Sequence, residues 1–300
     1  MCKFYKYVTV DTGKKILENG TLRWSTPAAL NDPFDMQFAF QLPTNLHEVR
    51  TKIFERWYRR IVGQRINRAT DGIGPAALTA SSWTPTTRDE FEQEIGSAID
   101  QSLSRLVNGV ESVNKWLFRD HFANSKILCF SELYDSILMW SYYAANHSGL
   151  VLRFTGNTTG ESLSSARPVR YIDQMPPLYD QEALCDLLDP DGRYFSDNGT
   201  ERIMNEMIWT KSSHWSHERE WRLYASGGEI VAAHQDIPFS LTELDGVIFG
   251  MRTSDEDRKA ITDLVQAKYP HAESLQARAK PNAYELMIEG LSPYRVGARR

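Results

Sequence analysis

The sequence predicts an α+β fold that carries a helical insertion. Short segments in which apolar and polar residues alternate, the pattern of strands, occur near both ends of the chain. Segments with helical periodicity lie between them, but the two kinds do not alternate regularly enough for a doubly wound parallel sheet. The 300 residues are 41% hydrophobic, so the chain can bury a sizeable core.

The N-terminal segment predicts a strand, a helix and a second strand. Residues 4–9 alternate aromatic or β-branched side chains with polar ones, which favours a strand. A short helix extends to Leu17, and Gly20 stands where a helix commonly ends. A strand over residues 22–25 leads into a turn at residues 31–35, because Asn and Asp bond their own backbone there and proline fixes φ.

Residues from about 44 to 122 predict a helical insertion within a single α+β domain that spans residues 1–300. Apolar residues recur at helical spacing at the start of this stretch and again from about Asp89 to Phe122. Residues 71–87, rich in glycine, proline and threonine, separate the two helical parts.

The core resumes after the insertion. Strands are expected at residues 126–131, 150–154, 169–172, 221–225, 246–249 and 284–288. Helices are expected at residues 136–145, 201–212 and 254–268.

Charge and cysteine usage bear on location and partners. The formal net charge of −5 gives no overall basic field for nucleic acid. Four arginines of the predicted insertion form either a local phosphate-binding face or an ordinary solvated helix face: Arg56, Arg59, Arg60 and Arg65. Three scattered cysteines without a C-x-x-C pair, and no run of about 18 apolar residues, lead us to expect a cytoplasmic protein with no membrane partner.

Missing motifs argue against several common enzyme classes. The sequence has no G-x-G-x-x-G after a strand, no G-x-x-x-x-G-K-[ST] and no G-x-S-x-G. A Rossmann dehydrogenase, a P-loop NTPase and an α/β-hydrolase are therefore not expected. His217-Glu218 begins like the helix of a zinc protease, but Trp221 stands where the second histidine belongs, so no metal site is predicted.

Three polar boxes among aromatic residues are the candidates for chemistry. In the first, Tyr5-Lys6-Tyr7, a strand turns Lys6 away from both tyrosines. Either the tyrosines pack the core while Lys6 lies in solvent, or Lys6 faces a cleft as a cation for a ligand phosphate or hydroxyl.

The second box joins the end of a strand, Phe130-Ser131, to an aromatic helix that contains Trp140 and Tyr143. One interpretation is a core helix that ends at a glycine turn. The other is an aromatic wall for a flat ring, with Ser131 as a hydrogen-bonding group at the strand end.

The third box surrounds Glu218 and Glu220. Residues 215–222 alternate in the manner of a strand or of the entry to a strand; within a strand, the two glutamates would lie on one face at adjacent pleats. Like charges repel, so one of the two should be paired or protonated. Arg222 could neutralise them in a surface ladder, or the pair could serve general acid–base chemistry or stabilise a developing cation.

Together, the boxes resemble the bacterial domain-of-unknown-function family 2971. The resemblance rests on Tyr5-Lys6-Tyr7, Asn31-Asp32-Pro33-Phe34-Asp35, Cys129-Phe130-Ser131-Glu132, Met139-Trp140-Ser141-x-Tyr143-Ala144 and Glu218-x-Glu220-Trp221-Arg222-Leu223. It covers both ends of the predicted core and skips the insertion.

A more distant resemblance links the opening to ADP-ribosyltransferase folds, and among them to DarT-like toxins that modify nucleic acid. It rests on Tyr5-Lys6-Tyr7-Val8-Thr9 followed by Ile16-Leu17-Glu18-Asn19-Gly20-x-Leu22. It implies an α+β fold with a split mixed or antiparallel sheet and flanking helices. In those folds a histidine or arginine on the first strand holds the ribose of NAD. Lys6 stands at that position, where its point charge cannot reproduce an arginine fork or an imidazole.

The same resemblance implies the remaining site residues and the activity. NAD is the implied substrate, in a site formed by Lys6, Tyr7, Phe130, Ser131, Trp140 and Tyr143. Glu220 would stabilise the ribosyl cation, and Glu218 would position the acceptor nucleophile. The implied function is transfer of ADP-ribose from NAD to nucleic acid or protein, by a toxin of a toxin–antitoxin or phage-defence system with an antitoxin protein as partner.

Two other functions stay open. One is an NAD-independent nucleotide or sugar hydrolase that uses Glu218 and Glu220 as its carboxylate pair. The other is a non-enzymatic partner-binding protein, in which the aromatic residues form an interface and the acids are structural.

Overall fold

The computed structural model of the chain describes residues 3–36, 42–43, 45–63, 87–115, 123–156, 162–175, 181–188, 199–226 and 232–291. The chain divides into two compact units. The first comprises Met1–Asp35, Phe122–Asp173 and Trp209–Arg300, and the second comprises Met36–His121 and Gln174–Ile208. The second unit contains nearly all of the predicted insertion and also a later segment, residues 174–208.

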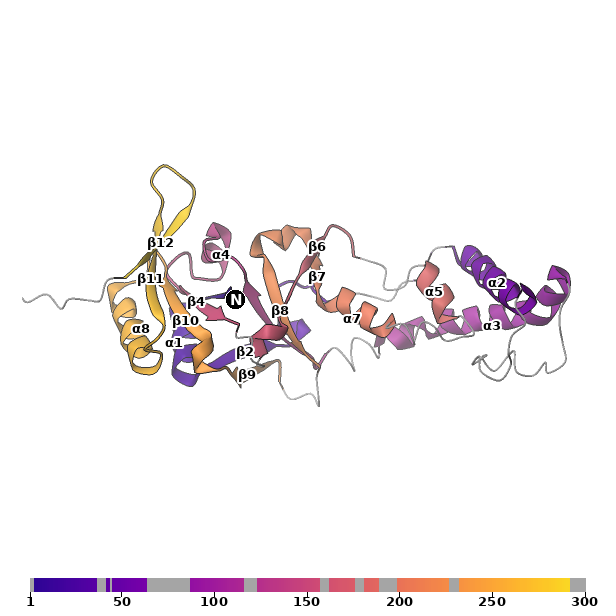
Figure 1. Ribbon diagram of the computed structural model, residues 1–300, viewed down its shortest axis with the longest axis horizontal. Helices are drawn as coiled ribbons and strands as arrows, with labels where there is room; N and C mark the ends of the chain where they lie inside the picture. The colour runs from indigo at the N-terminus through magenta and orange to yellow at the C-terminus, as the bar shows by residue number, and fades with distance from the viewer. Residues whose placement is uncertain are drawn as a thin grey trace, which may run out of the picture. The chain divides into compact units, whose positions relative to one another are not determined.

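The first unit is built on one large mixed sheet (Figure 1). Within the described ranges its strands follow the order β12-β11-β10-β4-β1-β3-β2-β9, with β8 joined to β3 and β5 joined to β8. The strands are β1 (Lys3–Val8), β2 (Thr21–Ser25), β3 (Lys126–Ser131), β4 (Leu150–Thr155), β5 (Arg167–Pro168), β8 (Glu220–Ala225), β9 (His234–Pro238), β10 (Leu244–Phe249), β11 (Glu273–Ala279) and β12 (Leu286–Gly290). Among the described strands of this sheet, β10 and β11 form the one parallel pair. The predicted α+β class with a mixed, largely antiparallel sheet is confirmed.

Helices and short turns flank this sheet. They are α1 (Val10–Asn19), α4 (Ile137–Tyr142) and α8 (Asp255–Lys268), with 3₁₀ turns η1 (Pro27–Ala29), η3 (Ser162–Ser165), η4 (Ser213–Glu218) and η5 (Leu241–Glu243). A separate parallel pair joins β6 (Arg170–Ile172) to β7 (Thr210–Ser212). Helix α1 ends at Gly20, which has φ 66° and donates its N–H to the carbonyl of Ile16, so the predicted helix end is confirmed.

Both faces of the central strands are buried. Leu152 of β4 and Phe249 of β10 belong to a core cluster that also contains Leu17 of α1 and residues of α8. The neighbouring Val151 and Ile248 belong to a second cluster with Trp140 of α4. Strands covered on both faces read as continuous apolar runs, which explains why β4 and β10 are so poor in polar residues.

The sheet splits along one edge of β3. Strand β8 pairs with β3 over its full length, from Lys126 to Ser131. On the opposite edge, in the described part of the chain, β1 meets β3 only at Ser131 and β2 meets it only at Ile127. The edge between these two points is therefore open, and polar side chains from several elements gather there.

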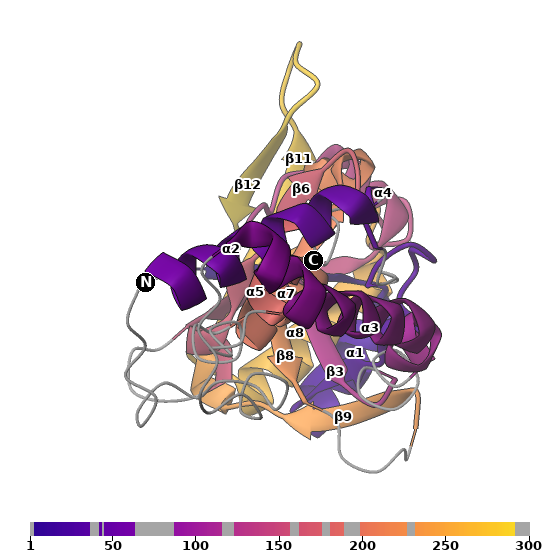
Figure 2. The ribbon, with the colours of Figure 1, turned by 90° about the vertical axis from the view of Figure 1, so that its right-hand side faces the viewer.

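The second unit is helical in its described part (Figure 2). It contains α2 (Leu46–Gly63), α3 (Arg88–Lys115), α5 (Gln181–Leu187) and α7 (Gly199–Ile208), and α2 packs against both α3 and α5. Phe54 and Phe91 meet edge-on across α2 and α3, with ring centroids 5.2 Å apart. No helix among the described residues combines the length and the apolar character that a membrane span requires.

The arginines of α2 differ in their surroundings. Arg56 forms ion pairs with Glu182 and Asp186 of α5, so its charge is neutralised within the helical unit. Arg59 is exposed. The side chain of Arg60 and the whole of Arg65 lie outside the described residues.

Candidate functional site

A cavity of about 230 Å³ occupies the opening along β3. Residues from β1, from the end of β3, from the end of α4 and from the junction of η4 with β8 line it. They include seven of the eight predicted site residues, namely Lys6, Tyr7, Phe130, Ser131, Tyr143, Glu218 and Glu220. The split of the sheet thus brings together segments that are far apart in the sequence.

Lys6 lies half-buried in this opening. Its Nζ donates a hydrogen bond of 2.8 Å to the carbonyl oxygen of Cys129, on the open edge of β3. Burial lowers the pKa of the Lys6 ammonium, and electrostatic interactions with Cys129, Glu220 and Glu218 offset this only in part. Of the two interpretations of the first box, the structure matches the one in which Lys6 faces a cleft.

Glu218 and Glu220 converge, but Glu218 lies in the entry to the strand and not in the strand itself. Residues 213–218 form the 3₁₀ turn η4, which Ser212 caps by accepting a hydrogen bond from the backbone N–H of His214. Arg219 follows in the left-handed conformation, with φ 46°, and β8 begins only at Glu220. The chain therefore makes a turn at Arg219, between the two glutamates, instead of continuing as a pleated strand.

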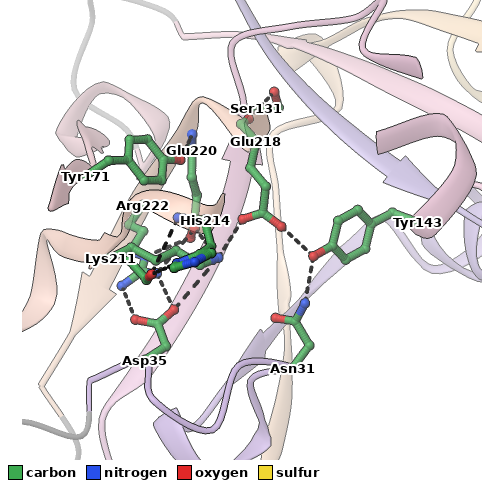
Figure 3. A network of polar contacts seen from close by, with 11 residues as sticks. Asn31, Asp35, Ser131, Tyr143, Tyr171, Lys211, His214, Glu218, Glu220 and Arg222 are labelled. Carbon is green, nitrogen blue, oxygen red and sulfur yellow. Dashed lines mark hydrogen bonds and ion pairs between the residues drawn. The ribbon is translucent and has the colours of Figure 1, made fainter. Parts of the chain in front are cut away.

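A buried ion network joins the two glutamates to three other side chains (Figure 3). Lys211 donates to Oε2 of Glu218 and, over 2.9 Å, to Oε2 of Glu220. Arg222 donates from Nε to Oε1 of Glu220 over 2.7 Å. Its two terminal nitrogens donate one hydrogen bond each to the carboxylate of Asp35. Arg222 is 0% exposed, so the predicted surface ladder is wrong: Arg222 neutralises Glu220 in the interior.

The network fixes charge states. Burial alone would raise the pKa of Glu220, but Arg222 and Lys211 hold it well below its usual range. Burial alone would lower the pKa of Lys211, but Glu220, Glu218 and Asp35 raise it. Glu220 and Lys211 are therefore charged at neutral pH. Burial raises the pKa of Asp35, by contrast, and Arg222 and Lys211 offset this only in part.

Glu218 is held differently from Glu220. Its Oε1 accepts a hydrogen bond from the hydroxyl of Tyr143, which in turn accepts one of 2.6 Å from the side-chain amide of Asn31 (Figure 3). Burial, followed by the hydrogen bond to Glu218, raises the pKa of Tyr143, so its phenol stays protonated. Glu218 thus contacts one ammonium and one neutral phenol, whereas Glu220 contacts an ammonium and a guanidinium.

The predicted aromatic wall is only partly present. Phe130 and Tyr143 line the cavity. Trp140 does not: it is fully buried, donates its indole N–H to the carbonyl of Tyr134 over 2.9 Å, and packs edge-on against Tyr7. The cofactor-binding position predicted for Trp140 is corrected to a core position, because its ring and its N–H are both satisfied in the second core cluster.

Ser131 and Tyr7 line the cavity with their polar atoms already engaged. The Ser131 hydroxyl donates to the carbonyl of Glu218 over 2.6 Å and accepts from the backbone N–H of Leu133. The Tyr7 hydroxyl donates to the carbonyl of Leu133 over 2.9 Å. Ser131 therefore positions the glutamate box, and both side chains shape the wall.

Lys211, Asp35 and Asn31 are among the members of the site that were not predicted as site residues. Lys211 lies in the short strand β7, and no periodicity or motif in the sequence around it indicates a role in the site. Asp35 and Asn31 belong to the box that predicts a turn. Asp32 does form that turn, since its side chain accepts from the N–H of Phe34 over 2.9 Å. Among the described residues, no group of three or more His, Cys, Asp or Glu is arranged to hold a metal ion.

Comparison with known families finds one match. Residues 139–223 match the family described as Protein of unknown function (DUF2971). Over this segment the chain is similar to that family. The first resemblance is thereby confirmed, and the DUF2971 match contains Tyr143, Lys211, Glu218, Glu220 and Arg222 of the site. Neither the curated proteins nor the solved structures give a match to the chain.

Proposed function

We propose that this chain is an ADP-ribosyltransferase-like enzyme that transfers ADP-ribose from NAD to a macromolecular acceptor. One observation carries the proposal: Lys6, Phe130 and Glu218, from three separate sequence boxes, line one cavity at the split of the sheet. A cation, an aromatic ring and a carboxylate are suited to NAD cleavage. They also follow the chain order of the ADP-ribosyltransferase folds that the sequence resembles.

The reaction makes defined demands on these groups. The bond between ribose C1′ and the nicotinamide nitrogen breaks, and its electron pair leaves with nicotinamide. The ribosyl group then carries an oxocarbenium-like positive charge, which a nearby carboxylate stabilises. An acceptor oxygen or nitrogen forms the new bond to C1′ and loses its proton to a carboxylate or to water.

We assign the carboxylate that faces the ribose to Glu218, which reverses the roles implied by the resemblance. Arg222 donates to both carboxylate oxygens of Glu220, and Lys211 donates to one of them, so the charge of Glu220 is neutralised within the network. Glu218 shares Lys211 and is otherwise held by Tyr143, a neutral donor. Its charge is the more available to a developing cation.

The resemblance extends the proposal to a biological setting. The acceptor is nucleic acid or protein, and the enzyme acts in the cytoplasm as a toxin of a toxin–antitoxin or phage-defence system, with an antitoxin as partner. Uncontrolled expression of the wild type should then arrest growth.

A hydrolase that uses the glutamate pair receives less support. Such enzymes need one carboxyl group that is protonated at neutral pH, in order to donate to the leaving group. Arg222 and Lys211 hold the pKa of Glu220 low, so Glu220 could supply only the ionised member of such a pair. A purely structural role for the acids would leave all turnover unaffected by their substitution, which the same experiment examines.

The direct test supplies the purified protein with NAD labelled in its ADP-ribose part, together with lysate DNA, RNA and protein. We expect label to enter a macromolecule, and Glu218→Gln to slow transfer by about 100-fold or more. The matched control is Glu289→Gln, an exposed glutamate of β12 that pairs with Arg278, and it should keep the wild-type rate. Digestion with nuclease or protease then identifies the acceptor. Equal transfer by Glu218→Gln and wild type, or none by folded wild type, would refute the proposal.

A further inference from the structure

A second cavity of about 380 Å³ adjoins the first. Five residues line both: Lys6, Tyr7, Arg23, Ser25 and Tyr143. From this shared wall, the second cavity extends along α1 and β2. We call the cavity at the glutamates the first chamber and its neighbour the second chamber.

The two chambers differ in charge. Among the described residues, the first is lined by three acids, Asp35, Glu218 and Glu220, and by equally many cations, Lys6, Arg23 and Lys211. The second is lined by Lys6, Lys15 and Arg23. Asp236, the one acid among the described residues that line the second chamber, is already engaged, because Arg23 binds it in bidentate fashion over 2.9 and 3.1 Å. Within the described part of the chain, Lys6 and Lys15 form no ion pair, so the basic residues that line the second chamber are not balanced by carboxylates.

Lys6 stands at the junction of the chambers. Its ammonium has three donors, and one of them bonds the carbonyl of Cys129. A half-buried ammonium without a carboxylate partner is costly to keep, and an anion bound beside it removes much of that cost. The lowered pKa of Lys6 reflects this unbalanced burial.

We propose that the second chamber binds the phosphate-bearing half of a ligand whose reactive half occupies the first chamber. Lys6 contacts the phosphates at the junction, and Lys15 contacts them from α1. The first chamber alone is smaller than a usual small-molecule site of about 300 Å³ or more, so a ligand that spans both is the better fit. If the proposed function holds, the reactive half is the nicotinamide ribose and the other half is adenosine diphosphate; phosphate binding itself does not depend on that function.

Titration calorimetry of the full chain with ADP, AMP and adenosine tests this chamber. We expect ADP to bind more tightly than AMP, and AMP more tightly than adenosine, with ADP affinity falling as salt is raised. Lys15→Gln should weaken ADP binding by about fivefold and leave adenosine unchanged. The matched control is Lys14→Gln, which lies next to Lys15 on α1, pairs with Glu18 over 3.8 Å and lines neither chamber.

The outcomes separate this inference from the proposed function. Equal affinity for ADP and adenosine, an equal effect of the two lysine variants, or no ADP binding by the folded wild type would overturn the phosphate chamber. If the affinities follow the expected order but no label is transferred from NAD, phosphate binding in the second chamber is supported and the proposed transferase activity is rejected. Transfer of label that Lys15→Gln and Lys14→Gln leave equally fast, at NAD concentrations below saturation, would reject the chamber alone.

Discussion

Lys6 is placed where it costs stability, which is a property of ligand-binding residues rather than of core residues. Burial lowers the pKa of Lys6 in the folded chain, so between that value and about 10.4 the unfolded chain binds more protons. The free energy of unfolding of the wild type therefore rises with pH across this window. Replacing the ammonium by an uncharged chain of similar length should remove the cost.

We accordingly expect Lys6→Met to raise the free energy of unfolding by about 1 kcal/mol at neutral pH and to abolish ADP binding. Denaturant titrations from about pH 7 to pH 10 should show the advantage of the variant shrinking as the pH approaches the unfolded lysine pKa of about 10.4. A variant less stable than wild type at neutral pH would mean that the ammonium is satisfied without a ligand.

Glu220 should behave in the opposite way, as a structural anion. Its pKa is held low by Arg222 and Lys211, so its contribution is present above the unfolded carboxyl pKa of about 4.3 and is lost as pH falls through the lower folded value. Glu220→Gln should reduce the free energy of unfolding by about 3 kcal/mol at pH 7, because two buried cations lose a partner.

The difference between Glu220→Gln and wild type should shrink below about pH 4. Thermal unfolding at neutral and acid pH measures it, and Glu289→Gln, from an exposed pair, should cost less than about 1 kcal/mol at either pH. A destabilisation by Glu220→Gln that stayed constant with pH would show that its charge is not what stabilises the fold.

At the scale of elements, the junction of η4 and β8 decides how the glutamates meet. Arg219 has φ 46°, a conformation that costs a non-glycine residue about 1–2 kcal/mol and a β-branched residue most of all. The Arg219 side chain forms an ion pair with the half-buried Glu132, and neither residue lines the first chamber.

Arg219→Gly should therefore keep label transfer within about twofold of wild type and change stability by less than about 1 kcal/mol. Arg219→Val should lower the free energy of unfolding by about 1–2 kcal/mol and slow transfer, because it favours an extended chain that separates Glu218 from Glu220. Unfolding and transfer assays on both variants check this. Equal effects of glycine and valine would show that the side chain, not the backbone turn, matters.

The same junction shows where sequence reasoning reaches its limit. Alternation allowed a strand through Glu218, but a side-chain cap from Ser212 and one left-handed residue produce a turn that alternation cannot reveal. Elements with clear apolar patterns, such as α1, β4 and α8, were predicted close to their observed bounds. β11 (Glu273–Ala279) was missed, since its polar and charged residues obscure the apolar alternation of a strand.

For the whole molecule, the site depends on topology that no local pattern contains. Lys6 and Glu220 were predicted as candidates from their own boxes, but only the split between β1 and β3 brings them to one cavity. Lys211 was missed because its role depends on ion pairs with three carboxylates from other segments, and the sequence around a single lysine does not reveal them. The helices α2 and α3 bury apolar residues at helical spacing, such as Ile53 and Ile95. This periodicity was therefore recognisable from the sequence alone.

The most direct measurement is a crystal structure of the full chain with a non-hydrolysable NAD analogue. We expect the nicotinamide ribose in the first chamber, beside Glu218 and Phe130, and the diphosphate in the second, between Lys6 and Lys15. An analogue bound outside both chambers, one with its diphosphate at the glutamates, or a cavity left empty at saturating concentration would contradict the proposed site.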